Sequence, residues 1–137
     1  MWTYEHTAMS TASPEALWDV WSDMASWPDW NGGIERIEVD GPFEVGTRFT
    51  MTPPGEEPIP MRLVEVIPGL SFSDEMDGGD FVVLTVHRLD PLADGTRITY
   101  RTEISGPAAD DIGPELGPAI TADFSEVVRA LAAHAER

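Results

Sequence analysis

The sequence predicts an α+β domain in which an antiparallel β-sheet is covered on one face by a C-terminal helix. Two observations lead to this fold class. Between Ile34 and Ser105, short stretches that alternate apolar and polar residues are separated by closely spaced turn sequences, as in a meander of β-hairpins. After residue 105, apolar residues recur at the spacing of one helix face. A sheet with one wet face needs such a cover for its apolar face.

The first elements along the chain are a strand and a helix. Residues 2–10 alternate between two faces, which predicts a strand. Ser13, Pro14 and Glu15 then supply the cap, the first-position proline and the acidic residue that favour the start of a helix. A second short helix is expected where residues 27–33 end the helical region.

The central part of the chain predicts six further strands. Turn sequences rich in Gly, Pro and Asp separate them, and each connection is too short for a parallel crossover. The last strand has the clearest pattern, with Ile98 and Tyr100 on one face and Arg97 and Arg101 on the other. The expected strands are residues 34–40, 45–52, 59–67, 70–76, 80–89 and 96–105.

The C-terminal segment predicts one long amphipathic helix with charged residues on its outer face. Pro114 and Pro118 are expected in or before its first turn, because a proline in mid-helix costs about 3 kcal/mol. No internal repeat or linker divides the chain, so residues 1–137 are expected to form a single domain. The apolar stripe of the helix consists of Leu116, Ile120, Phe124, Val127, Val128, Leu131 and Ala135.

The composition excludes several kinds of chemistry. The chain has no Cys, Lys or Gln, and its 25 acidic and 8 basic residues give a formal net charge of −17. Without Cys there is no thiolate nucleophile, disulfide or thiolate metal site, and without Lys there is no Schiff base or P-loop. The charge disfavours nucleic acid as a partner. Any activity is therefore expected to depend on non-covalent proton transfer by His, Tyr and acidic residues.

Location and cofactors can also be predicted. No run of 18 apolar residues occurs, so no membrane insertion is expected, and the first residues lack the basic and apolar regions of a signal peptide. We therefore expect a cytoplasmic protein. None of the three histidines has metal-ligand spacing, and the acidic segment 74–80 lacks the EF-hand pattern, so it is interpreted as a hairpin tip. We expect no metal and no other cofactor.

Five short motifs follow one another along the chain: residues 12–20 (ASPEALWDV), 27–31 (WPDWN), 45–49 (VGTRF), 66–69 (VIPG) and 94–98 (DGTRI). In this order they resemble the START-related superfamily, specifically its polyketide cyclase/dehydrase-like (SRPBCC) branch, over nearly the whole chain. The resemblance implies a helix-grip fold, in which a curved seven-stranded antiparallel sheet wraps around a long C-terminal helix, with two short helices after the first strand. It also implies a deep cavity for a hydrophobic or aromatic small molecule.

The resemblance leaves the activity open, because the superfamily contains carriers, receptors, cyclases and hydrolases. One hypothesis is a polyketide cyclase/dehydrase-like enzyme that acts by proton transfer on an apolar carbonyl-bearing substrate. The alternative is a non-catalytic carrier or sensor of a hydrophobic ligand. A third hypothesis is that the concave or edge surface binds a protein partner. The chain is expected to be a monomer or a homodimer.

Three residues are the candidate acid/base groups. His87 and His6 have the parity of the inward face, and an imidazole with a pKa of about 6.5 suits enolisation at neutral pH. Tyr100 can hydrogen-bond a substrate carbonyl as it gains negative charge. The alternative for each is a structural role, as a buried or half-buried residue whose polar atom is held in a hydrogen bond. The other side chains expected to line the cavity are Tyr4, Trp30, Phe49, Met51, Met61, Leu63, Glu65, Phe72, Phe81, Thr85, Thr102, Ile120 and Phe124.

One position departs from the pattern of the family. Aromatase/cyclase members place an arginine and a serine of the cavity on the fourth strand, where this sequence aligns Leu63 and Glu65. Arg62, next to them, has the outward parity. An inward carboxylate at Glu65 would imply chemistry different from that of a polyketide aromatase.

Overall fold

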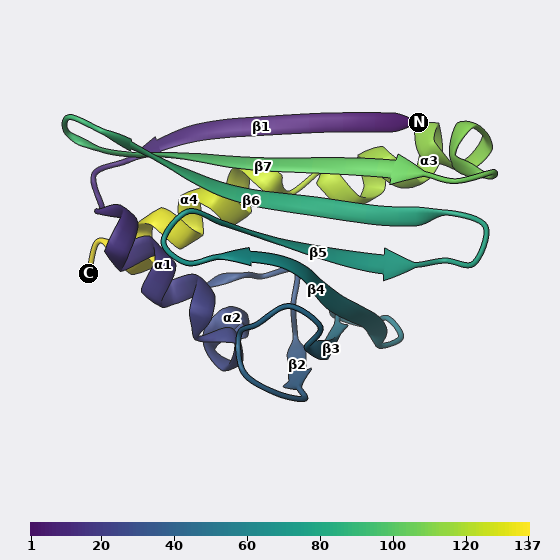
Figure 1. Ribbon diagram of the computed structural model, residues 1–137, viewed down its shortest axis with the longest axis horizontal. Helices are drawn as coiled ribbons and strands as arrows, with labels where there is room; N and C mark the ends of the chain where they lie inside the picture. Colours follow the sequence, from purple (N-terminus) through teal and green to yellow (C-terminus); the bar gives the residue numbers. More distant parts are fainter.

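The computed structural model describes all 137 residues and contains one antiparallel sheet with the strand order β1-β7-β6-β5-β4-β3-β2. Figure 1 shows the helix α4 crossing behind this sheet, with α1 and α2 at one end. The expected architecture, a seven-stranded sheet gripping a C-terminal helical segment, is confirmed. The elements are β1 (Trp2–Ser10), α1 (Pro14–Ser22), η1 (Met24–Ser26), α2 (Trp27–Trp30), β2 (Arg36–Val39), β3 (Arg48–Thr52), β4 (Ile59–Ile67), β5 (Ser71–Asp77), β6 (Val82–Leu92), β7 (Gly95–Ser105), α3 (Ala109–Thr121) and α4 (Phe124–Ala135).

The strands differ from the expected ranges mainly at their ends. The largest difference is in β6, which continues to Leu92 although the sequence predicts a break at Asp90 and Pro91. Residues 90–92 remain paired with β7, with Asp90 opposite Arg97 and Leu92 opposite Gly95. The connection between the two strands is therefore shorter than the turn sequence suggests, and their pairing is correspondingly longer.

The C-terminal segment forms two helices, where the sequence predicts one. α3 contains Pro114 and Pro118 in its interior, so the expectation that they precede or open the helix is wrong. Neither proline has an N–H to donate within the helix, which weakens and bends it. The segment turns again between Thr121 and Phe124. As a result α3 packs on β1 and β7, while α4 packs on β1, α1 and α2. None of the helices has both the length and the hydropathy to cross a membrane.

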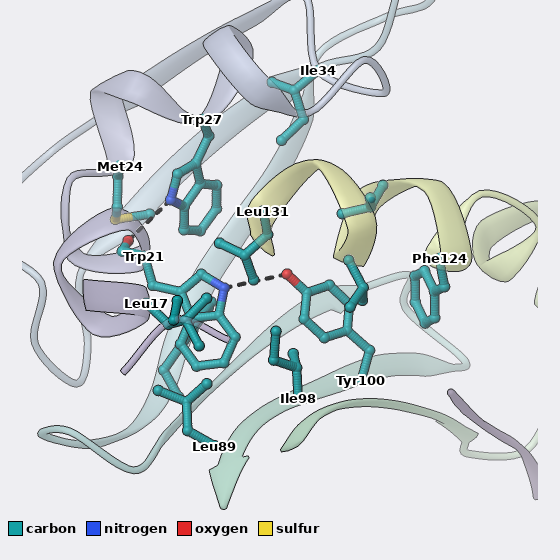
Figure 2. Close-up of a cluster of buried hydrophobic side chains, with 14 of the residues drawn as sticks. Leu17, Trp21, Met24, Trp27, Ile34, Leu89, Ile98, Tyr100, Phe124 and Leu131 are labelled. Carbon is teal, nitrogen blue, oxygen red and sulfur yellow. Dashed lines mark hydrogen bonds between the residues drawn. The ribbon is translucent and has the colours of Figure 1, made fainter. Parts of the chain in front are cut away.

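The core forms where α1 and α4 meet the sheet. Ser13 caps α1 by accepting a hydrogen bond from the backbone N–H of Ala16 at 3.1 Å, as its sequence predicts. Leu17 and Trp21 are then fully buried. Figure 2 shows the Trp21 indole beside Tyr100 of β7, whose hydroxyl accepts a hydrogen bond from Trp21 Nε1 at 3.2 Å. This bond connects the first helix to β7, the strand next to the edge strand β1.

A smaller cluster lies at the other end of the sheet, around Val83, Ile104 and Ala109. Trp2 packs against it under α3. The two buried glycines of that helix, Gly113 and Gly117, leave the space that the Trp2 indole occupies, since a Cβ at Gly117 would overlap the ring. This contact explains why α3 forms despite its prolines: tertiary packing overrides a poor helix propensity.

The contact between Trp2 and Gly117 gives a testable prediction. Gly117→Ala should lower the free energy of unfolding by about 1–2 kcal/mol, because overpacking outweighs the gain of about 1 kcal/mol in helix propensity. Urea unfolding followed by circular dichroism measures the change. In a Trp2→Ala background the same substitution should become stabilising. Gly32→Ala, at a position with open space around it, is the matched control and should change stability by less than about 0.5 kcal/mol.

Candidate functional site

The inner face of the sheet, which α3 and α4 cover, carries a band of polar side chains. Strand register aligns them in two neighbouring rows: Asp74, Thr85 and Thr102 in the first, His87 and Tyr100 in the second. Residues paired across strands have Cβ atoms about 4.5–5.5 Å apart, so each row is continuous. The Thr85 and Thr102 hydroxyls are hydrogen-bonded at 3.0 Å. We call these five residues the polar band. Its first row lies between the two hydrophobic clusters of the core, and Tyr100 of its second row belongs to the larger one.

Asp74 is the carboxyl group of the polar band. It lies on β5 between Phe72 and Met76, and only 4% of the residue is exposed. Burial raises the pKa of Asp74 to about 7, and no hydrogen bond or neighbouring cation opposes this shift. A buried carboxyl without a partner is costly in its ionised form. At neutral pH the group therefore exists in both protonation states, which suits an acid or a base.

The sequence interpretation missed Asp74. The predicted strand 70–76 contains Asp74, but the acidic segment 74–80 is interpreted as a hairpin tip, so Asp74 is not among the predicted site residues, whereas β5 continues to Asp77. A usable signal was present, because Asp74 has the same parity as Phe72, which the sequence places inward. The run of acidic residues that follows concealed this signal.

His87 lies on the inner face, as its parity predicts, but its environment is that of a structural residue. The imidazole stacks on the Phe72 ring with centroids 4.0 Å apart, and Nδ1 is 3.2 Å from the Phe72 carbonyl oxygen. Since a carbonyl oxygen only accepts, Nδ1 carries the proton and Nε2 is the free acceptor. Burial lowers the pKa of His87 to about 3, against the opposing effect of this hydrogen bond. The ring is therefore neutral and only weakly basic at pH 7.

Tyr100 is buried beside His87, with ring centroids 4.6 Å apart. Burial is the main cause that raises the pKa of Tyr100, and the hydrogen bond from Trp21 lowers it. The negative charges of Asp74 and Asp123 raise it further. The hydroxyl therefore stays protonated, and because it accepts from Trp21 its own proton remains available for donation. This is the property that a partner for a carbonyl oxygen needs.

His6 lies at the edge of the sheet, paired with Tyr100 in the register of β1 and β7. It is half-buried and lines a groove of about 450 Å³ between β1 and α4. Arg129 and Glu136 of the helical segment line the same groove. His6 therefore opens toward this groove at the sheet edge, and two strands, β7 and β6, separate it from β5, which carries Asp74.

The expected inward orientation of Glu65 is wrong. A β-bulge in β4 shifts the register, so that Leu63 pairs with Asp74 while Glu65 pairs with Ser73. Since Asp74 and Ser73 point to opposite faces of β5, Glu65 belongs to the outer face, and it is exposed. Arg62 is also on that face, where its guanidinium pairs with Glu75 at 2.7 Å. The inward carboxylate is supplied by β5 and not by β4.

The remaining residues expected to line a cavity fall into three groups. Those in the core, with little exposed surface, are Phe49, Leu63, Phe72, Thr102 and Phe124. Those that are only half-buried are Trp30, Met51, Met61, Phe81, Thr85 and Ile120. Tyr4, at the edge of the inner face, is 40% exposed and lies 6.2 Å from the Phe124 ring. Of the half-buried group, Trp30, Met51 and Met61 pack against the larger cluster, and Phe81 and Ile120 pack against the smaller one.

The two tryptophans of α2, at its first and last positions, have different surroundings. Trp27 is buried, and its Nε1 donates to the carbonyl oxygen of Trp21 at 2.9 Å. Trp30 is half-buried, and its enclosed Nε1 has no hydrogen-bonding partner. Trp27 is thus a packing residue, whereas Trp30 has an unsatisfied donor.

The burial of Asp74 predicts a pH-dependent stability. Folding raises the pKa of the Asp74 carboxyl from 3.8 to about 7. The folded protein is therefore stabilised when Asp74 is protonated, and this stabilisation is complete below about pH 4. That stability is lost as the pH rises through about 7. Asp74→Asn should therefore match the wild type near pH 4 and exceed it at pH 8, by at most about 4 kcal/mol at 1.36 kcal/mol per pKa unit.

Urea unfolding at pH 4.5 and pH 8 measures this difference. Glu65→Gln, which removes an exposed carboxylate from the adjacent strand, controls for the change in net charge. Equal stability of Asp74→Asn and the wild type at both pH values would contradict the assignment of Asp74 as a buried, unpartnered carboxyl.

Comparison with known structures supports the fold. The chain is similar to the di-domain ARO/CYC StfQ from the steffimycin biosynthetic pathway (TM-score 0.78, 16% identity, 98% of this chain and 50% of that chain). It is also similar to Ara h 8.0201 (TM-score 0.77, 14% identity, 97% and 96%) and to norcoclaurine synthase from Thalictrum flavum (TM-score 0.73, 22% identity, 95% and 83%). The chain thus spans half the length of StfQ. At these identities the likeness shows the fold.

The sequence places the chain in a known protein family. No curated protein sequence matches the chain. The profile of the family described as "Polyketide cyclase / dehydrase and lipid transport" matches residues 1–136. Together with the helix-grip fold, this match over the whole chain confirms the resemblance inferred from the five motifs. The chain belongs to the polyketide cyclase/dehydrase and lipid transport family.

Proposed function

We propose that this protein is a small acid/base enzyme of the cyclase/dehydrase type, in which Asp74 exchanges a proton with an apolar carbonyl-bearing molecule bound on the inner face. The observation that carries the proposal is the burial of Asp74 without a partner. A carboxyl kept in such a place lowers stability when it ionises, so a role in function is the reason to retain it. A general base works best when its pKa lies near the working pH.

The proposed binding space lies between the polar band and the C-terminal helices. Half-buried apolar side chains lie on both sides of the polar band: Met51 and Met61 pack against the larger hydrophobic cluster, and Met76 and Ile120 pack against the smaller one. Methionines suit flat or irregular ligands because their side chains are flexible and polarisable. The description of the family names polyketides and lipids, which supports an apolar ligand.

In the proposed reaction, Asp74 removes a proton from the carbon next to the substrate carbonyl. Tyr100 donates a hydrogen bond to the oxygen that becomes negative, and the hydrogen bond from Trp21 strengthens this donor. For a dehydration, the same proton returns from Asp74 to a β-hydroxyl, which leaves as water while the carbon–carbon double bond forms. His87 acts as a wall of the site, since its Nδ1 is bound to Phe72.

A non-catalytic carrier or sensor of the same ligand is the second candidate. The observation in its favour is the state of His87, whose imidazole is neutral, stacked and hydrogen-bonded. With both expected histidines in structural or edge positions, the proposed chemistry depends on Asp74. The two candidates therefore differ in their effect on a bound ketone. The enzyme would act on the ketone only when the Asp74 carboxylate is present, whereas the carrier would bind it without reaction.

Hydrogen exchange at a ketone tests this proposal. 2-Tetralone is an apolar bicyclic ketone whose α-hydrogens exchange with deuterated buffer, which proton NMR follows. The protein should accelerate this exchange by about a hundredfold or more, the usual contribution of a positioned base. Asp74→Asn should reduce the rate to that of buffer while 2-tetralone still binds. Glu65→Gln should keep the wild-type rate.

The outcomes separate the two candidates. Binding of 2-tetralone without accelerated exchange would favour the carrier and contradict the enzyme. Exchange that is equally fast in Asp74→Asn would show that another group is the base. The rate should also rise with pH up to about 8, because the base is the ionised form of a carboxyl with a pKa of about 7.

A further inference from the structure

No arginine projects from the strands into the polar band. Seven of the eight arginines are exposed, and Arg101 is half-buried on the outer face, where it pairs with Glu103 at 3.2 Å and with Glu5 at 3.9 Å. Arg129 lies on the groove beside β1, at the sheet edge. His87, the one histidine in the polar band, is neutral. No protein cation is therefore positioned to balance a negative charge at the polar band.

Acidic groups do face this region. Asp74 projects from β5, and Asp123 stands half-buried at the start of α4. The charges of both act on the Tyr100 hydroxyl, since each disfavours the tyrosinate form. The interior around the polar band therefore has a negative potential, in a protein whose net charge is already −17.

We infer that Asp74 selects the ligand by charge, so that the site prefers ring-bearing molecules with an N–H or O–H donor, protonated amines above all, and rejects carboxylates and phosphates. The inference rests on the proposed binding at the inner face and adds the chemical class of the ligand. Asp74 is thus a specificity-determining residue as well as a base.

Two physical effects produce this selection. A hydrogen bond between an ammonium group and a carboxylate is charge-assisted and stronger than one between neutral groups, and a site with little water screens it weakly. A ligand carboxylate would instead meet a like charge with no cation to neutralise it. Hydrogen bonds to charged groups contribute enough to change an affinity by about tenfold or more.

Three naphthalene compounds of similar shape test the inference: 2-(1-naphthyl)ethylamine, 2-(1-naphthyl)ethanol and 3-(1-naphthyl)propanoate. Isothermal titration calorimetry at pH 8 gives their dissociation constants. The amine should bind the wild type about tenfold more tightly than the alcohol, and the propanoate about tenfold more weakly. In Asp74→Asn the three constants should converge. Glu65→Gln removes the same single charge from the outer face and should keep the wild-type order.

A second measurement uses pH. At pH 5.5 Asp74 is mostly protonated, so the preference for the amine over the alcohol should shrink in the wild type and stay absent in Asp74→Asn. The other titratable groups of this region are His87 on β6 and Tyr100 on β7, in the neighbouring row of the sheet, and Asp123 at the start of α4, whose charge acts with that of Asp74 on the Tyr100 hydroxyl. Asp123→Asn removes the charge of the half-buried acid and leaves Asp74 unchanged. This variant should keep the order of the three ligands.

The outcomes distinguish this inference from the proposed function. If the amine, the alcohol and the propanoate bind the wild type equally, or if Asp74→Asn leaves their order unchanged, the inference is overturned while the binding of apolar rings stands. If none of the three binds, the proposed binding at the inner face fails, and the inference fails with it. If Glu65→Gln shifts the order as far as Asp74→Asn does, net charge and not Asp74 makes the selection, which also overturns the inference.

Discussion

The pairing register of β5, β6 and β7 is the constraint on which the candidate site depends. Asp74 lies opposite Thr85, and Thr85 lies opposite Thr102, so that three strands bring their polar side chains to one place. A shift of one residue would turn all of these side chains to the solvent and expose the apolar residues beside them. Ile98 and Ile104 on the same face of β7 are fully buried, so their burial holds the register.

The fold could be predicted from the sequence because its signals are local. Alternation along the last strand and the closely spaced turns identify antiparallel hairpins, and the apolar stripe after residue 105 identifies their cover. The paired glycines and prolines of α3 could not be interpreted in this way. Their helix is stabilised by Trp2, more than one hundred residues away in the sequence, and a contact at that distance leaves no local signal.

The site was predictable only in part, for a related reason. Parity places His87 and Tyr100 on the inner face, and the structure agrees. Parity fails at Glu65, because the bulge in β4 adds a residue to one strand without any mark in the sequence. The chemical state of each group also depends on partners that a sequence does not show. His87 has the residue type of a base, yet its stacking on Phe72 and its bond to the Phe72 carbonyl make it a poor one.

The two faces of the sheet treat their acidic residues in opposite ways. On the outer face Glu75, Asp90 and Glu103 each have an arginine within 3.2 Å, and solvent screens the rest. On the inner face Asp74 has no arginine partner and little contact with solvent. Its ionisation would therefore depend on the ligand group that lies against it. A ligand that supplies a positive charge or a strong donor would favour the ionised carboxylate and lower the pKa of Asp74. Binding would then release a proton near neutral pH, and the stability lost by ionisation would be recovered in the complex. The same carboxyl that weakens the free protein would thus make ligand binding and proton release one linked event.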